Sequence, residues 1–129
     1  MKGWTIMKAK ILIVDDELDV IELVTQILEK EDYQIITATD GEEALQKVYE
    51  EHPQVVLLDI LLPKKNGYEI CQEIKSNKNL LNTIVVMFTV KAFDSDRKQA
   101  LQVGADYYFT KPFSAVSLLA FLQNILETS

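Results

Sequence analysis

Short apolar runs alternate along the chain with segments whose apolar residues recur every three or four positions. Each run is rich in β-branched or aliphatic residues and is bounded by polar or turn-forming residues, a pattern typical of β-strands. The five runs begin near Lys10 (KILIV), Gln34 (QIITA), Val55 (VVLLD), Ile84 (IVVMFT) and Tyr107 (YYFT). The alternation of strands with helices favours right-handed crossovers and a parallel sheet covered on both faces. The pattern therefore predicts one α/β domain.

Four of the five intervening helices carry a clear apolar stripe. Asp40 and Glu43 predict a capping box at the start of the second helix, and the third should begin after Asn66-Gly67. The stripes consist of Val20, Ile21, Val24, Ile27 and Leu28 in the first helix, Ala44, Leu45 and Val48 in the second, Ile70, Cys71 and Ile74 in the third, and Leu118, Leu119, Leu122, Ile125 and Leu126 in the fifth, which starts at Ser114.

The fourth helix, expected from Asp94 to Val103, is different because its segment DSDRKQ contributes almost nothing apolar. Its attachment to the sheet would depend on Phe93, Ala100, Leu101 and Val103. Little buried area would then resist its displacement, so we expect it to be the least firmly held helix.

A carboxylate stands at the end of the most apolar strand, QVVLLDILLP at residues 54–63, in the form of Asp59. In an open parallel sheet, ligands bind beyond the carboxyl ends of the strands. Asp15 and Asp16 end the first strand at the same edge, so the three carboxylates would converge if these strands are neighbours. Like charges this close require either protonation of one group or a bound cation. Oxygen ligands with open positions suit Mg²⁺, and Mn²⁺ is a second candidate.

Two further polar residues are expected at this edge: Thr89 at the end of the fourth strand and Lys111 after the fifth. A hydroxyl, an ammonium group and a divalent cation around one carboxylate would form an anion site built around a nucleophile. Phosphoryl transfer requires mainly positioning and charge neutralisation, which these groups supply. Asp59 would then attack phosphorus and become an aspartyl phosphate.

Composition narrows the classes of function. The 129 residues carry 13 basic and 20 acidic side chains, a net charge of −7, which disfavours direct binding to nucleic acid or to an anionic membrane. The single cysteine cannot form an internal disulfide, and the start MKGWTIMKAK lacks the apolar region of a signal peptide, so we expect a cytoplasmic location. Residues 1–7 are predicted to be a loosely ordered N-terminal extension, with Met7 as an alternative start, and residues 8–129 the domain.

Four segments, ILIVDDE, VVLLDILLPKKNG, MFTV and GADYYFTKPF, resemble in this order the receiver domain of two-component response regulators. The resemblance runs from about Lys8 to the C-terminus and is nearest to the single-domain, chemotaxis-regulator-like kind. It implies a flavodoxin-like (βα)5 doubly wound parallel five-stranded sheet of order 2-1-3-4-5. It also implies a signalling domain rather than an enzyme, phosphorylated with Mg²⁺ by a histidine kinase or a histidine phosphotransfer protein, and assisting its own phosphorylation and dephosphorylation.

The resemblance also assigns roles to individual residues. Asp59 matches the phosphoacceptor, Asp16 the direct metal ligand, Asp15 the neighbour that binds metal through water, and the Leu61 backbone carbonyl a third protein ligand. Three more residues match the switch: Thr89 as the hydroxyl that moves onto the phosphoryl group, Lys111 as the lysine that pairs with it, and Tyr108 as the switch aromatic, which would turn inward as Thr89 moves. Val90 departs from the family, where a small residue usually follows the threonine. We expect it either to prolong the life of the phosphorylated form or to make small-molecule donors poor substrates.

Other interpretations remain open from the sequence. Asp15 and Asp16 could simply stabilise a helix N-terminus, and Tyr108 could be an ordinary strand aromatic. Val116, Ala120 and Phe121 of the fifth helix, next to the fourth helix and fifth strand, could form a surface for a downstream protein target or a homodimer. The alternative functions are a phosphorylation-independent receiver-like interaction module and a flavin-binding flavodoxin-like domain, although the four glycines form no phosphate-cradling loop. The kinase, the target, the oligomeric state and whether the chain stands alone or belongs to a longer regulator also stay open.

Overall fold

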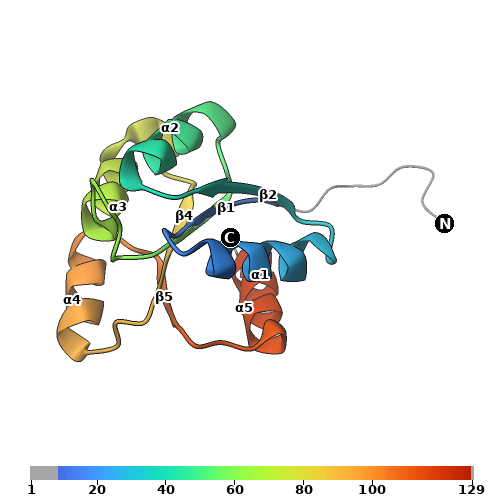
Figure 1. Ribbon diagram of the computed structural model, residues 1–129. Coiled ribbons are helices and arrows are strands. Elements are labelled where there is room, and N and C mark those ends of the chain that lie inside the picture. The colour runs from blue at the N-terminus through green and yellow to red at the C-terminus, as the bar shows by residue number, and fades with distance from the viewer. Residues whose placement is uncertain (1–8, 129) are drawn as a thin grey trace.

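Five parallel strands form the centre of the structure, a computed structural model that describes residues 9–128 (Figure 1). The predicted N-terminal extension, residues 1–7, lies outside the described residues. The strand order is β2-β1-β3-β4-β5, which confirms the doubly wound arrangement expected from the resemblance. The strands are β1 (Lys10–Val14), β2 (Gln34–Ala38), β3 (Val55–Leu58), β4 (Ile84–Thr89) and β5 (Tyr107–Thr110).

Helices cover both faces of the sheet (Figure 1). On one face, Ile11 and Ile13 of β1 pack with helices α1 and α5, and on the other Leu12 and Val14 pack with α2, α3 and α4. Successive strand residues thus point into two different apolar cores, which explains why the central strands lack polar alternation. The helices are α1 (Leu18–Glu29), α2 (Gly41–Glu51), α3 (Gly67–Ser76), α4 (Asp94–Gln102) and α5 (Ala115–Thr128), with a short 3-10 helix, η1, at Lys78–Leu80. None of the helices within residues 9–128 is long and apolar enough to cross a membrane.

Polar side chains fix where α2 and α3 begin. The Asp40 carboxylate accepts from the Glu43 N–H at 2.9 Å, and the Asn66 side chain accepts from the Glu69 N–H at 3.1 Å. The Glu43 carboxylate in turn accepts from the N–H of Thr39 at 2.8 Å. The predicted capping box is therefore present, with its return bond made one residue earlier than expected.

The prediction for α4 is wrong in two of its four attachment residues. Phe93 is 78% exposed and Leu101 71%, whereas Ala100 is buried and Val103 packs against the core. Because adjacent helical residues point about 100° apart, seating Ala100 on the core turns Leu101 toward solvent. α4 therefore offers the core even less apolar surface than expected, and its weak attachment stays a prediction.

Candidate functional site

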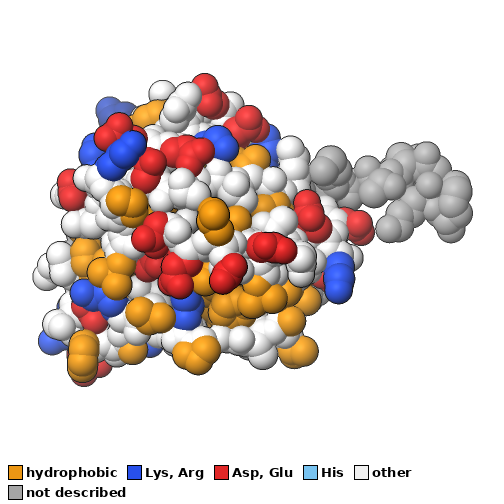
Figure 2. Space-filling view, viewed as in Figure 1, with side chains coloured by type: hydrophobic (Ala, Val, Ile, Leu, Met, Phe, Trp, Pro, Cys, Tyr) orange, Lys and Arg blue, Asp and Glu red, His pale blue; other side chains and the backbone are white. Residues whose placement is uncertain are grey.

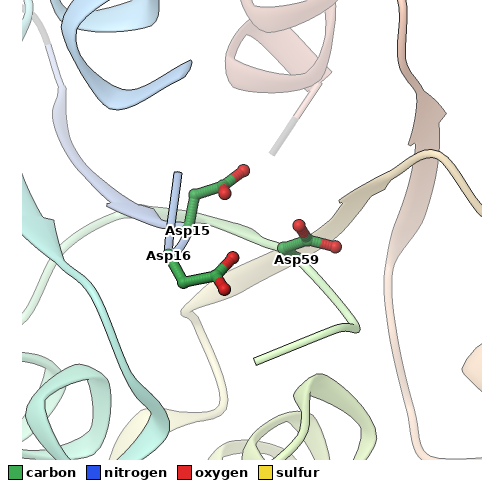
Figure 3. A group of neighbouring side chains, drawn as sticks. All are labelled: Asp15, Asp16 and Asp59. Atoms are coloured by element: carbon green, nitrogen blue, oxygen red, sulfur yellow. The ribbon is translucent and has the colours of Figure 1, made fainter. Parts of the chain in front are cut away.

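The carboxyl ends of β1 and β3 bring three carboxylates together. Val14 pairs with Leu58 in register, so the residues that follow, Asp15, Asp16 and Asp59, lie at one edge of the sheet. One oxygen from each carboxylate lies within 4.8 Å of the others, and Figure 3 shows them around a common space. Asp15 and Asp59 are buried and Asp16 is exposed.

Lys111, the residue after β5, joins this cluster. Its Nζ donates to the carboxylate of Asp15 and, at 3.2 Å, to Oδ2 of Asp59. Burial by itself would lower the pKa of Lys111, but the hydrogen bond to Asp15 and the charges of both carboxylates outweigh it and raise that pKa. Burial raises the pKa of Asp15, and the bond from Lys111 opposes this effect. Lys111 therefore stays protonated and holds the two buried carboxylates together.

The charges and donors of the site fit a divalent cation. Three carboxylates against one ammonium group leave two negative charges uncompensated when all are ionised. All the side-chain donors are oxygens, which Mg²⁺ and Mn²⁺ prefer. Asp16 is the carboxylate most open to solvent, and Asp15 already accepts from Lys111 and from the N–H of Glu17.

Backbone contacts fix the position of Asp59. Its N–H donates to the Val14 carbonyl at 3.0 Å, and its Oδ1 accepts from the Leu61 N–H at 3.2 Å. Gly67, the first residue of α3, lies against the same segment and donates its N–H to the Ile60 carbonyl at 2.9 Å. A Cβ on Gly67 would collide with the Asp59 carbonyl oxygen and come within 2.7 Å of the Ile60 Cα. Glycine is thus required for α3 to approach this closely. The expected role of the Leu61 carbonyl stays a prediction.

Thr89 and the loop that follows it border the site. Thr89 is fully buried, its carbonyl accepts from the Lys111 N–H at 2.9 Å, and its hydroxyl accepts from the Lys91 N–H at 3.3 Å. Val90, the next residue, is 59% exposed. The Thr89 carbonyl thus contacts Lys111, and the Thr89 hydroxyl contacts the β4–α4 loop, residues 90–93, through Lys91.

Tyr108 contacts this loop through its hydroxyl. Its hydroxyl donates to the Lys91 carbonyl at 2.6 Å, and the Arg97 guanidinium lies 4.6 Å from its ring centroid. The ring is half-buried against the core, and desolvation raises the pKa of Tyr108 to about 12. The inward turn of Tyr108 as Thr89 moves stays a prediction.

The structure also reveals contacts that the sequence did not indicate. Asp96 of α4 is buried beside Lys91, and Tyr68 of α3 lies next to it. The usual signal for an acidic residue at this helical position is a Ser, Thr, Asp or Asn three residues before it. Here that position is Phe93, so the signal is missing.

Comparisons with known proteins identify the family of the chain. The family model of the response regulator receiver domain matches residues 11–123. The alkaline phosphatase synthesis transcriptional regulatory protein PhoP of Bacillus subtilis is 42% identical over 123 residues, which cover 95% of this chain and 50% of PhoP. The chain thus spans about half the length of this curated relative.

Two solved structures illustrate the similarity of fold. The chemotaxis response regulator CheY4 of Vibrio cholerae matches with a TM-score of 0.87 and 29% identity, over 92% of this chain and 99% of that chain. The BeF3-activated DrrB receiver domain matches with a TM-score of 0.83 and 36% identity, over 94% and 99%. The chain therefore belongs to the response regulator receiver domain family of two-component systems.

Proposed function

We propose that this receiver domain accepts a phosphoryl group on Asp59 from a histidine kinase or a histidine phosphotransfer protein. The observation that carries the proposal is the pairing of Asp59 with Lys111 at 3.2 Å beside two further carboxylates. A carboxylate oxygen of Asp59 would form a bond to phosphorus while the phosphorus–nitrogen bond of the phosphohistidine breaks. The electron pair of that bond returns to the imidazole. The proposal thus has three parts: the donor is a histidine kinase or phosphotransfer protein, the acceptor is Asp59, and the reaction takes place in the cytoplasm.

Receiver domains bind Mg²⁺ in an acidic pocket, and the oxygen donors here fit that ion. We assign Asp16, Asp59 and the Leu61 carbonyl as direct ligands and Asp15 as a ligand through water, because Asp15 is already engaged by Lys111. When bound, the cation supplies positive charge to the phosphoryl oxygens. Lys111 supplies a second positive charge beside Asp59, and the buried position of Asp59 limits the access of water.

The switch follows from the charge that phosphorylation adds. A phosphoryl group brings close to two negative charges to Asp59, which favours any conformation that brings Lys111 and the Thr89 hydroxyl nearer. Movement of the Thr89 hydroxyl removes the acceptor of the Lys91 N–H. The Lys91 carbonyl in turn accepts from the Tyr108 hydroxyl. The signal would therefore pass from Asp59 through Thr89 to the β4–α4 loop and Tyr108.

The surface that would change is formed by α4, β5 and α5, and we propose that it binds a downstream protein target or a second copy of the chain. Leu101 and Val116, 71% and 78% exposed, lie on it, and Tyr107 packs edge-on against Phe121 at 5.7 Å. A cavity of about 260 Å³ lies between α4 and β5. The helix α5 contains no basic residue, and its exposed Val116 would make an apolar contact with a partner.

Charge argues against nucleic acid as the partner. The net charge is −7, and acidic side chains gather near the centre of the face in Figure 2 with apolar ones beside them.

Substituting Leu101→Ser and Val116→Ser should abolish partner or dimer binding measured by sedimentation. Leu81→Ser is the control, because Leu81 is 63% exposed but follows η1, outside this surface. Equal loss in the control would reject the proposed surface.

The phosphoacceptor is tested by labelling with a phosphorylated histidine kinase or phosphotransfer protein. Asp59→Asn should take up no label, whereas Asp32→Asn, an exposed turn residue, should be labelled like the wild type. Lys111→Ala should still be labelled but should lose the conformational response. Label on Asp59→Asn would place the acceptor elsewhere. A wild-type protein that takes up neither label nor beryllofluoride would support the alternative of a phosphorylation-independent interaction module. Bound flavin would support the alternative of a flavin-binding domain.

A further inference from the structure

Polar contacts, rather than apolar packing, attach the N-terminal end of α4. The Asp96 side chain, 11% exposed, accepts from the Phe93 N–H at 3.2 Å and lies 3.5 Å from the Lys91 Nζ. The Tyr68 hydroxyl of α3 donates to the Asp96 carbonyl at 3.4 Å. Phe93 has no side-chain acceptor, so Asp96 provides the side-chain half of a capping box by itself.

Lys91 connects this attachment to the proposed switch. Its N–H donates to the Thr89 hydroxyl at 3.3 Å, its carbonyl accepts from the Tyr108 hydroxyl at 2.6 Å, and its ammonium group faces Asp96. One residue of the loop is therefore in contact with β4, β5 and α4.

The rest of the loop has little else to hold it. Val90, Ala92 and Phe93 are all exposed, so apolar burial does not fix residues 90–93. The Asp96 carboxylate, in contrast, is buried, and a buried charge is costly unless it keeps its partners. The conformation of the loop should thus depend on Asp96 more than on any of its own exposed side chains.

We propose that Asp96 is a positioning residue of the switch: through Phe93 and Lys91, its carboxylate fixes the β4–α4 loop so that the Lys91 carbonyl meets the Tyr108 hydroxyl. This inference rests on the proposed function, in which Thr89 responds to the phosphoryl group. Without the carboxylate, the loop loses its anchor to α4, and Tyr108 no longer responds to events at Asp59.

The test follows Tyr108 directly in the intact chain. Protein labelled with 3-fluorotyrosine gives ¹⁹F signals for its five tyrosines, and the Tyr108 signal is assigned by its absence in Tyr108→Phe. In Asp96→Ala this signal should move toward that of free tyrosine and stop responding to beryllofluoride with Mg²⁺. Asp94→Ala is the matched control, because Asp94 is an exposed acidic residue in the same first helical turn. It should behave like the wild type.

A double-mutant cycle separates positioning from general loss of stability. Tyr108→Phe should change the affinity for beryllofluoride about two- to tenfold, the range that one net hydrogen bond supplies. Asp96→Ala should change it in the same direction by a similar factor, and the double variant should add nothing further. A purely structural role for Asp96 would give additive effects instead.

Three results would overturn the inference: additive effects, an Asp96→Ala variant that matches Asp94→Ala, or an unchanged Tyr108 signal. If Asp96→Ala does not fold, Asp96→Asn retains an acceptor for the Phe93 N–H but not the charge, and should give a partial effect. A wild type that binds no beryllofluoride would defeat the proposed function. The ¹⁹F signal of Tyr108 without ligand would still decide the role of Asp96.

Discussion

Asp59 lies at the end of a strand that is buried along its whole length, which restricts where its carboxylate can lie. A buried carboxylate is unfavourable unless it is paired and hydrogen-bonded. Lys111 and the Leu61 N–H fill these roles here. The fold itself therefore holds the carboxylate in place, and the Lys111 ammonium group sets one positive charge beside it.

Val90 should slow the loss of the phosphoryl group. Its side chain follows Thr89 directly and is larger than the residue usual in the family, so it should narrow the approach of water to phosphorus. Val90→Ala is expected to shorten the half-life of the phosphorylated form by up to about tenfold, a barrier change of about 1.4 kcal/mol. The measurement is the decay of label after the donor is removed.

Leu81→Ala is the control for this prediction, because Leu81 is also an exposed aliphatic residue but follows η1, outside the site and the α4–β5–α5 surface. Its half-life should equal that of the wild type. An unchanged half-life in Val90→Ala would remove Val90 from the account of dephosphorylation.

Cys71 should be inert in the folded protein. Its side chain is fully buried, and desolvation raises the pKa of its thiol from 9.0 to about 12. At pH 8 the thiolate fraction is then about three orders of magnitude lower than in the unfolded chain. A thiol-specific disulfide reagent should react with urea-unfolded protein and barely with native protein. Fast reaction of the native protein would contradict the burial.

The same shift sets a pH dependence of stability. Between pH 9 and about 12 the unfolded chain releases the Cys71 proton while the folded chain keeps it. The contribution of Cys71 to the free energy of unfolding is therefore complete below pH 9 and decreases as the pH rises through this window. Cys71→Ala should lose this component.

At the scale of elements, α4 differs from the other helices in how it is held. Ala100 is its buried apolar residue, and its other anchors are the polar contacts of Asp96 and the cation–π contact of Arg97 with Tyr108. The α3 helix, in contrast, buries Ile70, Cys71 and Ile74. With so little apolar surface buried, α4 has little to resist its displacement.

Substitutions at exposed residues of the α4 region should therefore cost little stability. Phe93→Ala and Leu101→Ala should each change the free energy of unfolding by less than about 0.5 kcal/mol. Ile74→Ala, at a fully buried position of α3, should cost roughly 2–5 kcal/mol. Urea denaturation measures all three. Amide exchange should be faster in α4 than in α3, and the reverse order would show that α4 is firmly held.

At the scale of the whole molecule, ligand binding and folding are linked because residues from β1, β3, β4 and β5 meet only in the folded chain. A ligand that binds only the folded state stabilises it by about 2.7 kcal/mol at a concentration one hundred times its Kd. Beryllofluoride with Mg²⁺ should accordingly raise the melting temperature. Asp59→Asn should show no such rise, and an equal rise in that variant would place the anion elsewhere.

Much of the fold and site was predictable from local sequence. Strands and helices follow from apolar periodicity, and Asp15, Asp16, Asp59, Thr89 and Lys111 were found because polar residues at the ends of buried strands must lie at one edge of a parallel sheet. The strand order came from the family resemblance, since alternating strands and helices fit several orders. The errors at Phe93 and Leu101 arose because apolar character does not set the rotation of a helix against its sheet.

The sequence by itself determined which elements form and which strand ends carry chemistry, because both depend on neighbours along the chain. Only the tertiary structure decided that Lys111 pairs with both Asp15 and Asp59, and that Lys91 lies between Thr89, Tyr108 and Asp96. These contacts join residues brought together by packing, some of them far apart in the chain. Local propensity cannot specify them, because they depend on which loops the packed helices and sheet place side by side.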